Sequence, residues 1–168
     1  MSSGLEPIRH ELVLPGVAPA RAFAAYVDLG SWWRAQYTPD EAGFRGARIE
    51  PWAGGRVLFV VDPLGEVEWG RVVEAVDGTE SSSPHDAGAA AVARLVHTST
   101  LAQPPGTSSV ITVEFVEPVE PVEPCEPEGS TLVRFAHGGW REGDEQLRAK
   151  FGDWPLILAR YSARAQAG

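Results

Sequence analysis

Cysteine is nearly missing from this chain of 168 residues. It contains a single cysteine, Cys125, and its histidines show no metal-ligand spacing such as two on one helix face. One cysteine can form neither an intrachain disulfide nor a cluster of thiolate ligands. We therefore expect no disulfide, no metal and no cofactor.

Long apolar runs are missing as well. Hydrophobic residues make up 43% of the chain, but no run approaches the ~20 residues that a membrane-spanning helix needs. Residues 1–11 lack the basic region, apolar stretch and small-residue cleavage site of a signal peptide. We expect a cytoplasmic protein without a membrane partner.

Positive charge is scarce, and motifs for phosphate binding and nucleophilic catalysis are not found. The formal net charge is -9, with Lys150 the single lysine, and a surface of this sign repels nucleic acid. Gly54–Gly55 and Gly138–Gly139 lack the lysine and the helix-opening pattern of a phosphate loop. No GxSxG sequence or Cys/His pairing supports covalent hydrolysis. The sequence thus predicts no nucleic-acid partner and no covalent catalyst.

Apolar residues recur with a period of two through most of the chain, which predicts strands, and with a helical period in two places. Pro19 opens the first helical stretch, and Pro155 interrupts the second. The second stretch carries an apolar stripe of Leu147, Phe151, Trp154, Leu158 and Tyr161. Strands are expected near residues 8–14, 44–49, 57–61, 66–76, 92–101, 111–115 and 131–137. The order is one strand, a helix, six strands and a helix, which predicts one α+β domain over residues 1–168.

Two segments of low complexity interrupt this pattern. Residues 77–91 contain almost nothing large and apolar, and residues 116–128 read VEPVEPVEPCEPE. Segments with so little apolar surface cannot offset the entropy of ordering, and regular prolines favour an extended polyproline conformation. Both are expected to be loops outside the core.

Seven short segments along the chain form a pattern: AFAAYVDLGSWW (22–33), WAGGRVLF (52–59), WGRVVEAV (69–76), RLVHTS (94–99), TVEF (112–115), TLVRFAHGGW (131–140) and WPLILARY (154–161). In this order they resemble the START-like (SRPBCC) superfamily, and within it the branch of activator-of-heat-shock-protein-90-ATPase homologues. The resemblance implies a helix-grip fold, in which a curved antiparallel sheet of about seven strands wraps a long C-terminal helix around a cavity. Where such relatives carry an aromatic residue and then a tryptophan, this chain has His97 and Ser99, which implies a more polar wall.

Strand phase selects the candidate ligand-cavity residues, because side chains two positions apart share a face. They are Trp69, Arg71, His97, Ser99, Phe115, Phe135, His137 and Trp154. The histidines could act as general acid or base, or be hydrogen-bonded core residues. Arg71 could hold an anionic group of a ligand, or lie at the rim. The rings could line a cavity, or fill the core completely.

The leading interpretation is a non-catalytic domain that binds a small and mostly apolar molecule, because no nucleophile is visible in the sequence. A first alternative is a cofactor-free cyclase or dehydratase that uses His97, His137 or Arg71 to move protons or stabilise an enolate. A second alternative comes from the resemblance alone: a co-chaperone that stimulates a heat-shock ATPase. The depth of the cavity and the pKa shifts of its residues distinguish the binding domain from the enzyme.

Overall fold

Seven strands and three α-helices form the fold in a computed structural model that describes residues 4–38, 40–78, 92–101, 103–118 and 129–167. The elements in chain order are β1 (Ile8–Leu14), α1 (Pro19–Val27), the 3₁₀ turns η1 (Leu29–Ser31) and η2 (Ala35–Tyr37), β2 (Phe44–Ile49), β3 (Arg56–Val61), β4 (Gly65–Val76), β5 (Ala93–Ser99), β6 (Ser109–Val116), β7 (Thr131–Gly138), α2 (Glu145–Ala149) and α3 (Trp154–Ala167). The expected order of strands and helices is confirmed.

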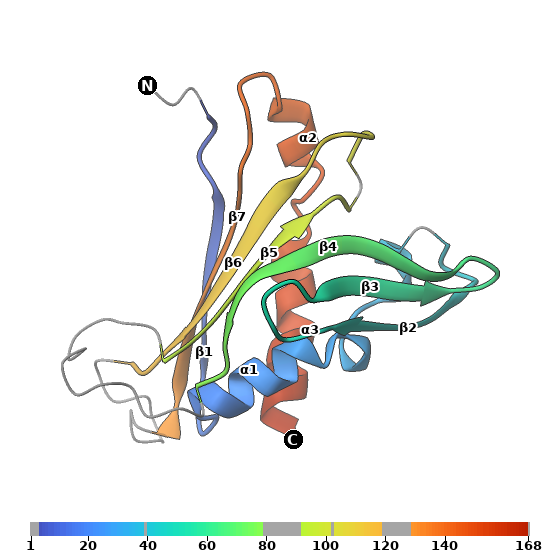
Figure 1. Ribbon diagram of the computed structural model, residues 1–168. Coiled ribbons are helices and arrows are strands. Elements are labelled where there is room, and N and C mark those ends of the chain that lie inside the picture. The colour runs from blue at the N-terminus through green and yellow to red at the C-terminus, as the bar shows by residue number, and fades with distance from the viewer. Residues whose placement is uncertain (1–3, 39, 79–91, 102, 119–128, 168) are drawn as a thin grey trace.

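The strands form one sheet in the order β1-β7-β6-β5-β4-β3-β2, and every neighbouring pair is antiparallel. The sheet curves, and α1 and α3 lie on its concave side (Figure 1). The two helices contact each other, α1 also contacts β5 and β6, and α3 contacts β1. The core therefore lies between the inner face of the sheet and these helices.

In the central strands β6 and β7, side chains alternate between the inner face, which packs on the core, and the outer face. In β7 the inward residues Thr131, Val133, Phe135 and His137 are buried. In β6 the same alternation buries Ser109, Ile111, Val113 and Phe115, which is the pattern of a strand that packs one face on a core.

Two bulges in β4 change which of its side chains face the helices. Trp69 is an extra residue relative to β3, and Val73 is an extra residue relative to β5. Each extra residue shifts the alternation by one position. As a result Trp69 and Val72 are buried, whereas Arg71 and Val73 are exposed. The expectation that Trp69 and Arg71 share a face is therefore wrong.

The C-terminal helical stretch is divided as Pro155 predicts. α2 ends at Ala149 and α3 begins at Trp154, so that Pro155 lies in the first turn of α3, where its missing N–H leaves no hydrogen bond unmade. The stripe is confirmed over α3, where Trp154, Leu158 and Tyr161 are buried. Among the described residues, no helix is long and apolar enough to cross a membrane.

The expected loops fall mostly outside the described residues, at 79–91 and 119–128. The start of the second needs correction, because Val116 is the last residue of β6, pairs with Leu132 and is buried. The valine of the first Val-Glu-Pro unit continues the strand before its proline ends it.

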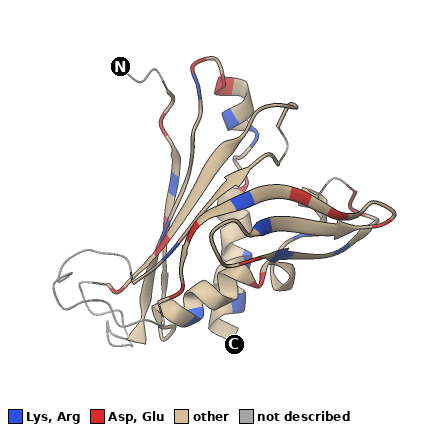
Figure 2. Cartoon of the chain, in the orientation of Figure 1, with Lys and Arg blue, Asp and Glu red and all other residues tan. Residues whose placement is uncertain are grey.

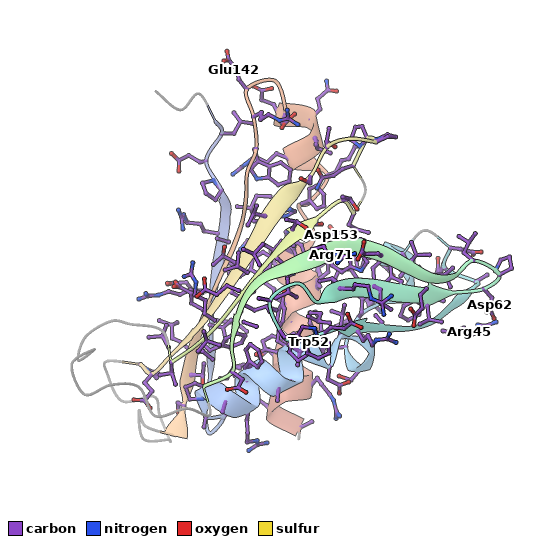
Figure 3. The ribbon with its side chains drawn as sticks, in the orientation of Figure 1. Arg45, Trp52, Asp62, Arg71, Glu142 and Asp153 are labelled. Atoms are coloured by element: carbon purple, nitrogen blue, oxygen red, sulfur yellow. The ribbon has the colours of Figure 1, made fainter. Side chains whose placement is uncertain are left out.

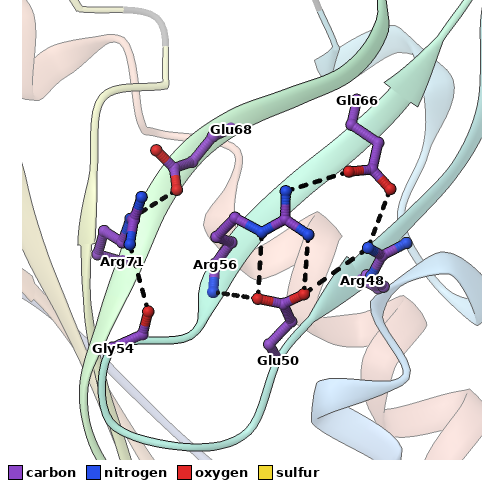
Figure 4. A network of polar contacts seen from close by, with 7 residues as sticks. All are labelled: Arg48, Glu50, Gly54, Arg56, Glu66, Glu68 and Arg71. Atoms are coloured by element: carbon purple, nitrogen blue, oxygen red, sulfur yellow. Dashed lines mark hydrogen bonds and ion pairs between the residues drawn. The ribbon is translucent and has the colours of Figure 1, made fainter.

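Charged residues of both signs lie along β2, β3 and β4 (Figure 2). Glu50 accepts hydrogen bonds from the backbone N, Nε and Nη2 of Arg56, at 2.9, 3.2 and 3.0 Å (Figure 4). These bonds lower the pKa of Glu50 to about 2. Glu66 pairs with both Arg48 and Arg56. The network joins the three strands on the side away from the helices.

Candidate functional site

Seven of the eight predicted cavity residues face inward and are buried, with exposed fractions of 5% or less. Their side chains pack against other core side chains and do not surround an open cavity. The ring centroids of Phe135 and Trp154 are 4.6 Å apart, and those of Trp69 and His97 are 5.7 Å apart. Phe115 packs edge-on against Phe23 of α1 at 5.7 Å. Here the filled-core alternative describes the structure better than the cavity.

Arg71 is the exception, and its predicted place in a cavity is wrong. Its side chain is 60% exposed on the outer face of β4, where Nε pairs with Glu68 and Nη1 donates to the carbonyl oxygen of Gly54 at 3.4 Å (Figures 3 and 4). The bulge at Trp69 turns this side chain outward. Arg71 therefore belongs to the surface network of β2–β4.

His137 is held by hydrogen bonds at both ring nitrogens. Its Nδ1 accepts from Nε1 of Trp154 at 3.0 Å, and its Nε2 lies 2.6 Å from Oγ of Ser109. Because an indole N–H can only donate, Nδ1 carries no proton, and Nε2–H must donate to Ser109. Ser109 also accepts from Gln103 Nε2 at 2.7 Å and donates to the carbonyl oxygen of Ser99 at 3.4 Å.

This tautomer excludes an activated Ser109–His137 pair, since the base of such a pair must accept the serine proton at the nitrogen that faces it. Burial, with a smaller contribution from nearby His97, lowers the pKa of His137 to about 3. His137 is therefore a neutral, fully satisfied core residue.

His97 is also neutral near pH 7, because burial lowers its pKa to about 4. Its Nδ1 donates to the carbonyl oxygen of Thr98 at 2.7 Å. Ser99 closes the same strand, where its Oγ accepts from the backbone N of Leu101 at 3.3 Å. For both histidines, the core alternative stated from the sequence fits the geometry.

The structure instead has a pocket of about 470 Å³ beside the first turn of α3, which we call the α3 pocket. It lies between α3, the η2 segment and the turn that follows β5. Its lining residues are Trp33, Gln36, Tyr37, Thr38, Leu101, Lys150, Phe151, Asp153, Trp154 and Ile157. Of the eight predicted residues, Trp154 alone is among them.

The walls of the α3 pocket combine aromatic and aliphatic surface with a few polar groups. Trp33 and Trp154 meet edge to face with centroids 6.2 Å apart, and Trp33 and Tyr37 at 6.3 Å. Leu101 and Ile157 add aliphatic surface, and polar groups come from other lining residues such as Lys150. Mostly apolar walls with a few polar groups are typical of small-molecule sites, and this volume lies within their usual range.

One hydrogen bond crosses from η2 to the start of α3 at this pocket. Tyr37 Oη donates to Oδ2 of Asp153 at 2.9 Å. Burial and this carboxylate raise the pKa of Tyr37, so the phenol keeps its proton. Asp153 lies directly before α3, and its carbonyl oxygen accepts from Leu156 and Ile157 (Figure 3). The contact therefore links two segments that both line the pocket.

Sequence reasoning missed most of the α3 pocket because its walls come from segments without periodicity. Trp33 and Tyr37 lie between α1 and β2, outside the periodic stretches of the sequence. Phe151 lies in the break between α2 and α3. Two tryptophans and a tyrosine in an irregular segment were the one available signal, because aromatic residues outside regular elements need a surface to pack on. No group of three or more His, Cys, Asp or Glu side chains that could hold a metal occurs in the part of the chain that the structure describes.

Solved structures show the same architecture at low sequence identity. Ara h 8.0201 matches with a TM-score of 0.55 and 11% identity, over 96% of this chain and 98% of its own. A protein from Nitrosomonas europaea matches with a TM-score of 0.55 and 13% identity, over 96% and 95%. A truncated norcoclaurine synthase from Thalictrum flavum matches with a TM-score of 0.50 and 13% identity, over 96% and 94%.

This chain has a helix-grip fold. The sheet, its antiparallel order and the C-terminal helix agree with these solved structures over nearly the whole chain. No family model and no curated protein matches the sequence. At these identities the likeness concerns the fold, so the function of this helix-grip domain must be argued from its own residues.

Proposed function

We propose that this helix-grip domain binds a small, largely apolar molecule in the α3 pocket without converting it. The observation that carries the proposal is the pocket itself: about 470 Å³, walled by Trp33, Tyr37, Phe151, Trp154 and neighbouring aliphatic groups. Planar rings in such walls suit a flat ligand, because stacked and edge-to-face contacts add to simple burial. Lys150 and the Tyr37–Asp153 contact would hold a polar end of the ligand toward solvent.

The positions of His97, His137 and Arg71 in the structure do not favour an enzyme that uses these residues. Neither histidine lines the α3 pocket, both stay neutral, and His137 has a partner at each nitrogen. Arg71 is on the outer face. One similar structure is a synthase, but its likeness to this chain concerns the fold. Assignment to the ATPase-activator-homologue branch and a cytoplasmic location are part of the same proposal, and they rest on the sequence.

Native mass spectrometry of protein purified from its own host tests the proposal. We expect a retained small molecule, whose mass is the same in every preparation. Leu101→Trp should remove it by filling the pocket, while Leu156→Trp should retain it, because Leu156 is on the exposed side of α3 and 62% exposed. A molecule that stays bound in both variants would place the site elsewhere.

A further inference from the structure

Two of the residues that line the α3 pocket are charged, Lys150 and Asp153. Asp153 already has a partner, because its Oδ2 accepts the hydroxyl proton of Tyr37 at 2.9 Å. Thr38, another polar lining residue, donates its hydroxyl to the carbonyl oxygen of Ala35 at 2.6 Å. Lys150, in contrast, forms no side-chain hydrogen bond or ion pair with any residue that the structure describes. The lining of the pocket therefore includes a cation without a partner in this part of the chain.

The local structure holds Lys150 at this place. α2 ends one residue earlier, at Ala149, and the backbone N–H of Lys150 donates to the carbonyl oxygen of Leu147 at 3.1 Å. Phe151, the next residue, is buried and lines the pocket. Lys150 itself is exposed, and a lysine in such a position covers apolar surface with its methylene groups while its ammonium group stays in water. Its charge therefore belongs at the rim of the pocket.

The charge balance at the pocket differs from that of the whole chain, which has 14 basic and 23 acidic residues. Asp153 is the one acidic residue in the lining, and its carboxylate is bound to Tyr37. Burial and Asp153 raise the pKa of Tyr37, and the positive charge of nearby Arg34 opposes this rise. Arg34 thus adds a second positive charge close to the pocket. This balance favours an anionic over a cationic group on the ligand.

We infer that Lys150 pairs with a carboxylate of the molecule bound in the α3 pocket. The inference rests on the proposed function and narrows the ligand class to flat, mostly apolar acids. The ring system of the ligand packs among the aromatic lining residues Trp33, Phe151 and Trp154. Its carboxylate stays at the rim, because burying an ionised group away from water is costly, and there it accepts a charge-assisted hydrogen bond from the Lys150 ammonium group.

Three derivatives of fluorene test this inference, because they share one flat ring system and differ in charge at neutral pH. Fluorene-2-carboxylic acid is an anion, fluorene-2-carboxamide is neutral and has nearly the same shape, and 2-(aminomethyl)fluorene is a cation. Their dissociation constants are measured by isothermal titration calorimetry. An ion pair at a partly exposed site predicts that the carboxylate binds about three- to fivefold more tightly than the carboxamide at low salt. Added salt should reduce this preference by screening, and the cation should bind more weakly than the carboxylate.

The variant Lys150→Met keeps an unbranched apolar side chain and removes the charge. It should abolish the preference for the carboxylate over the carboxamide, whereas Lys150→Arg should retain it. Arg21→Met is the matched control, because Arg21 is an exposed residue of α1 outside the pocket lining and its replacement changes the net charge equally. This variant should keep the full preference. Carboxamide binding in each variant also reports whether the pocket remains intact.

Equal affinities for the carboxylate and the carboxamide in the unsubstituted protein would overturn the inference and leave the proposed function standing. Tightest binding of the cation would also overturn it, and would assign the polar end of the ligand to Asp153. A preference that survives Lys150→Met would contradict the role of Lys150. Binding of none of the three probes would count against the proposed function itself, and with it the inference.

Because Lys150 is the single lysine of the chain, an independent measurement can follow it alone. Lysine-selective ¹³C labelling gives one Cε resonance, which is followed by NMR as each probe is added. The carboxylate should move this signal saturably and by more than the carboxamide does. Saturable shifts at Leu101 and Ile157 in the pocket lining, with no shift of the lysine signal, would place the carboxylate away from Lys150 and contradict the inference.

Discussion

Trp154 is the residue in which the core, a buried hydrogen bond and the α3 pocket meet. Its ring packs on Phe135 at 4.6 Å, its Nε1 donates to His137, and one side lines the pocket. Trp154→Ala should lower the free energy of unfolding by about 3 to 5 kcal/mol, through lost burial and an unpaired His137 Nδ1. Chemical denaturation measures it, with exposed Leu156→Ala as the control. A loss below about 1 kcal/mol would contradict the buried position.

The two buried histidines predict how stability depends on pH. Burial lowers the pKa of His97 to about 4 and that of His137 to about 3, from an ordinary 6.5. As the pH falls below about 6.5, the unfolded chain takes up protons that the folded domain does not, so stability falls. It is fully present above about pH 6.5 and is lost progressively toward pH 4, by at most about 1.4 kcal/mol per pH unit for each histidine.

Urea unfolding between about pH 7 and pH 5 measures this slope. The Glu50 network contributes below that range, since the pKa of Glu50 is lowered from 4.5 to about 2. His97→Gln should roughly halve the slope if it folds. Stability that is flat between the two pH values would contradict the neutral, buried state of both side chains.

The sequence predicted which face of the sheet the two histidines occupy, but not their hydrogen-bond partners. Alternation placed His97 and His137 on the inner face, and the structure agrees. Their partners were not predictable, because Ser109 and Trp154 come from other elements and meet His137 only in the folded chain. A histidine's tautomer depends on those partners.

Among the elements, β4 approaches β5 closely at Gly70. A Cβ at Gly70 would collide with the carbonyl oxygen of Thr98 and lie 3.3 Å from His97 Nδ1. Gly70→Ala should therefore destabilise the domain by about 1 to 3 kcal/mol, as expected for overpacking at rigid backbone. Gly46→Ala is the comparison, because a Cβ there meets nothing within 4 Å. Similar unfolding midpoints for the two variants would contradict the bulged geometry of β4.

The same bulges explain where strand-level prediction failed. Inner and outer faces of β6 and β7 followed directly from alternation, because neither strand has an irregular pairing in the described residues. In β4, the alternation expected from Trp69 to Arg71 assumed a regular strand, but the backbone gains an extra residue at Trp69. A bulge depends on pairing with neighbouring strands, so the sequence of one strand does not reveal it. Arg71 was misplaced for this reason.

At the scale of the whole molecule, each low-complexity segment connects two neighbouring strands whose ends are paired: β4 with β5, and β6 with β7. Val76 pairs with Arg94, and Val116 pairs with Leu132. Replacing residues 79–91 and 119–128 with short Gly/Ser turns should therefore keep cooperative thermal unfolding, because closing a shorter loop costs less entropy. A broad or absent transition by calorimetry would show that these segments contribute to the core.

The fold was predictable at this scale, and the pocket was not. The periodicity of apolar residues, and the ordered segments that resemble START-like proteins, predicted the curved sheet and the C-terminal helix. The α3 pocket depends on how η2, the turn after β5 and the α2–α3 break come together, and each of these is irregular and distant from the others in sequence. Trp154 was predicted because it also belongs to the periodic stripe of α3.

The central claim, that a small apolar molecule occupies the α3 pocket, is tested most directly by titrating methyl-labelled protein with fluorene and following methyl chemical shifts by NMR. We predict saturable shifts for Leu101 and Ile157, which line the pocket, and none for exposed Leu156 on the same helix as Ile157. Ring-current effects of a bound aromatic molecule act on the nearest methyl groups. Absence of saturable shifts at Leu101 and Ile157, or saturable shifts confined to methyl groups elsewhere, would contradict the account.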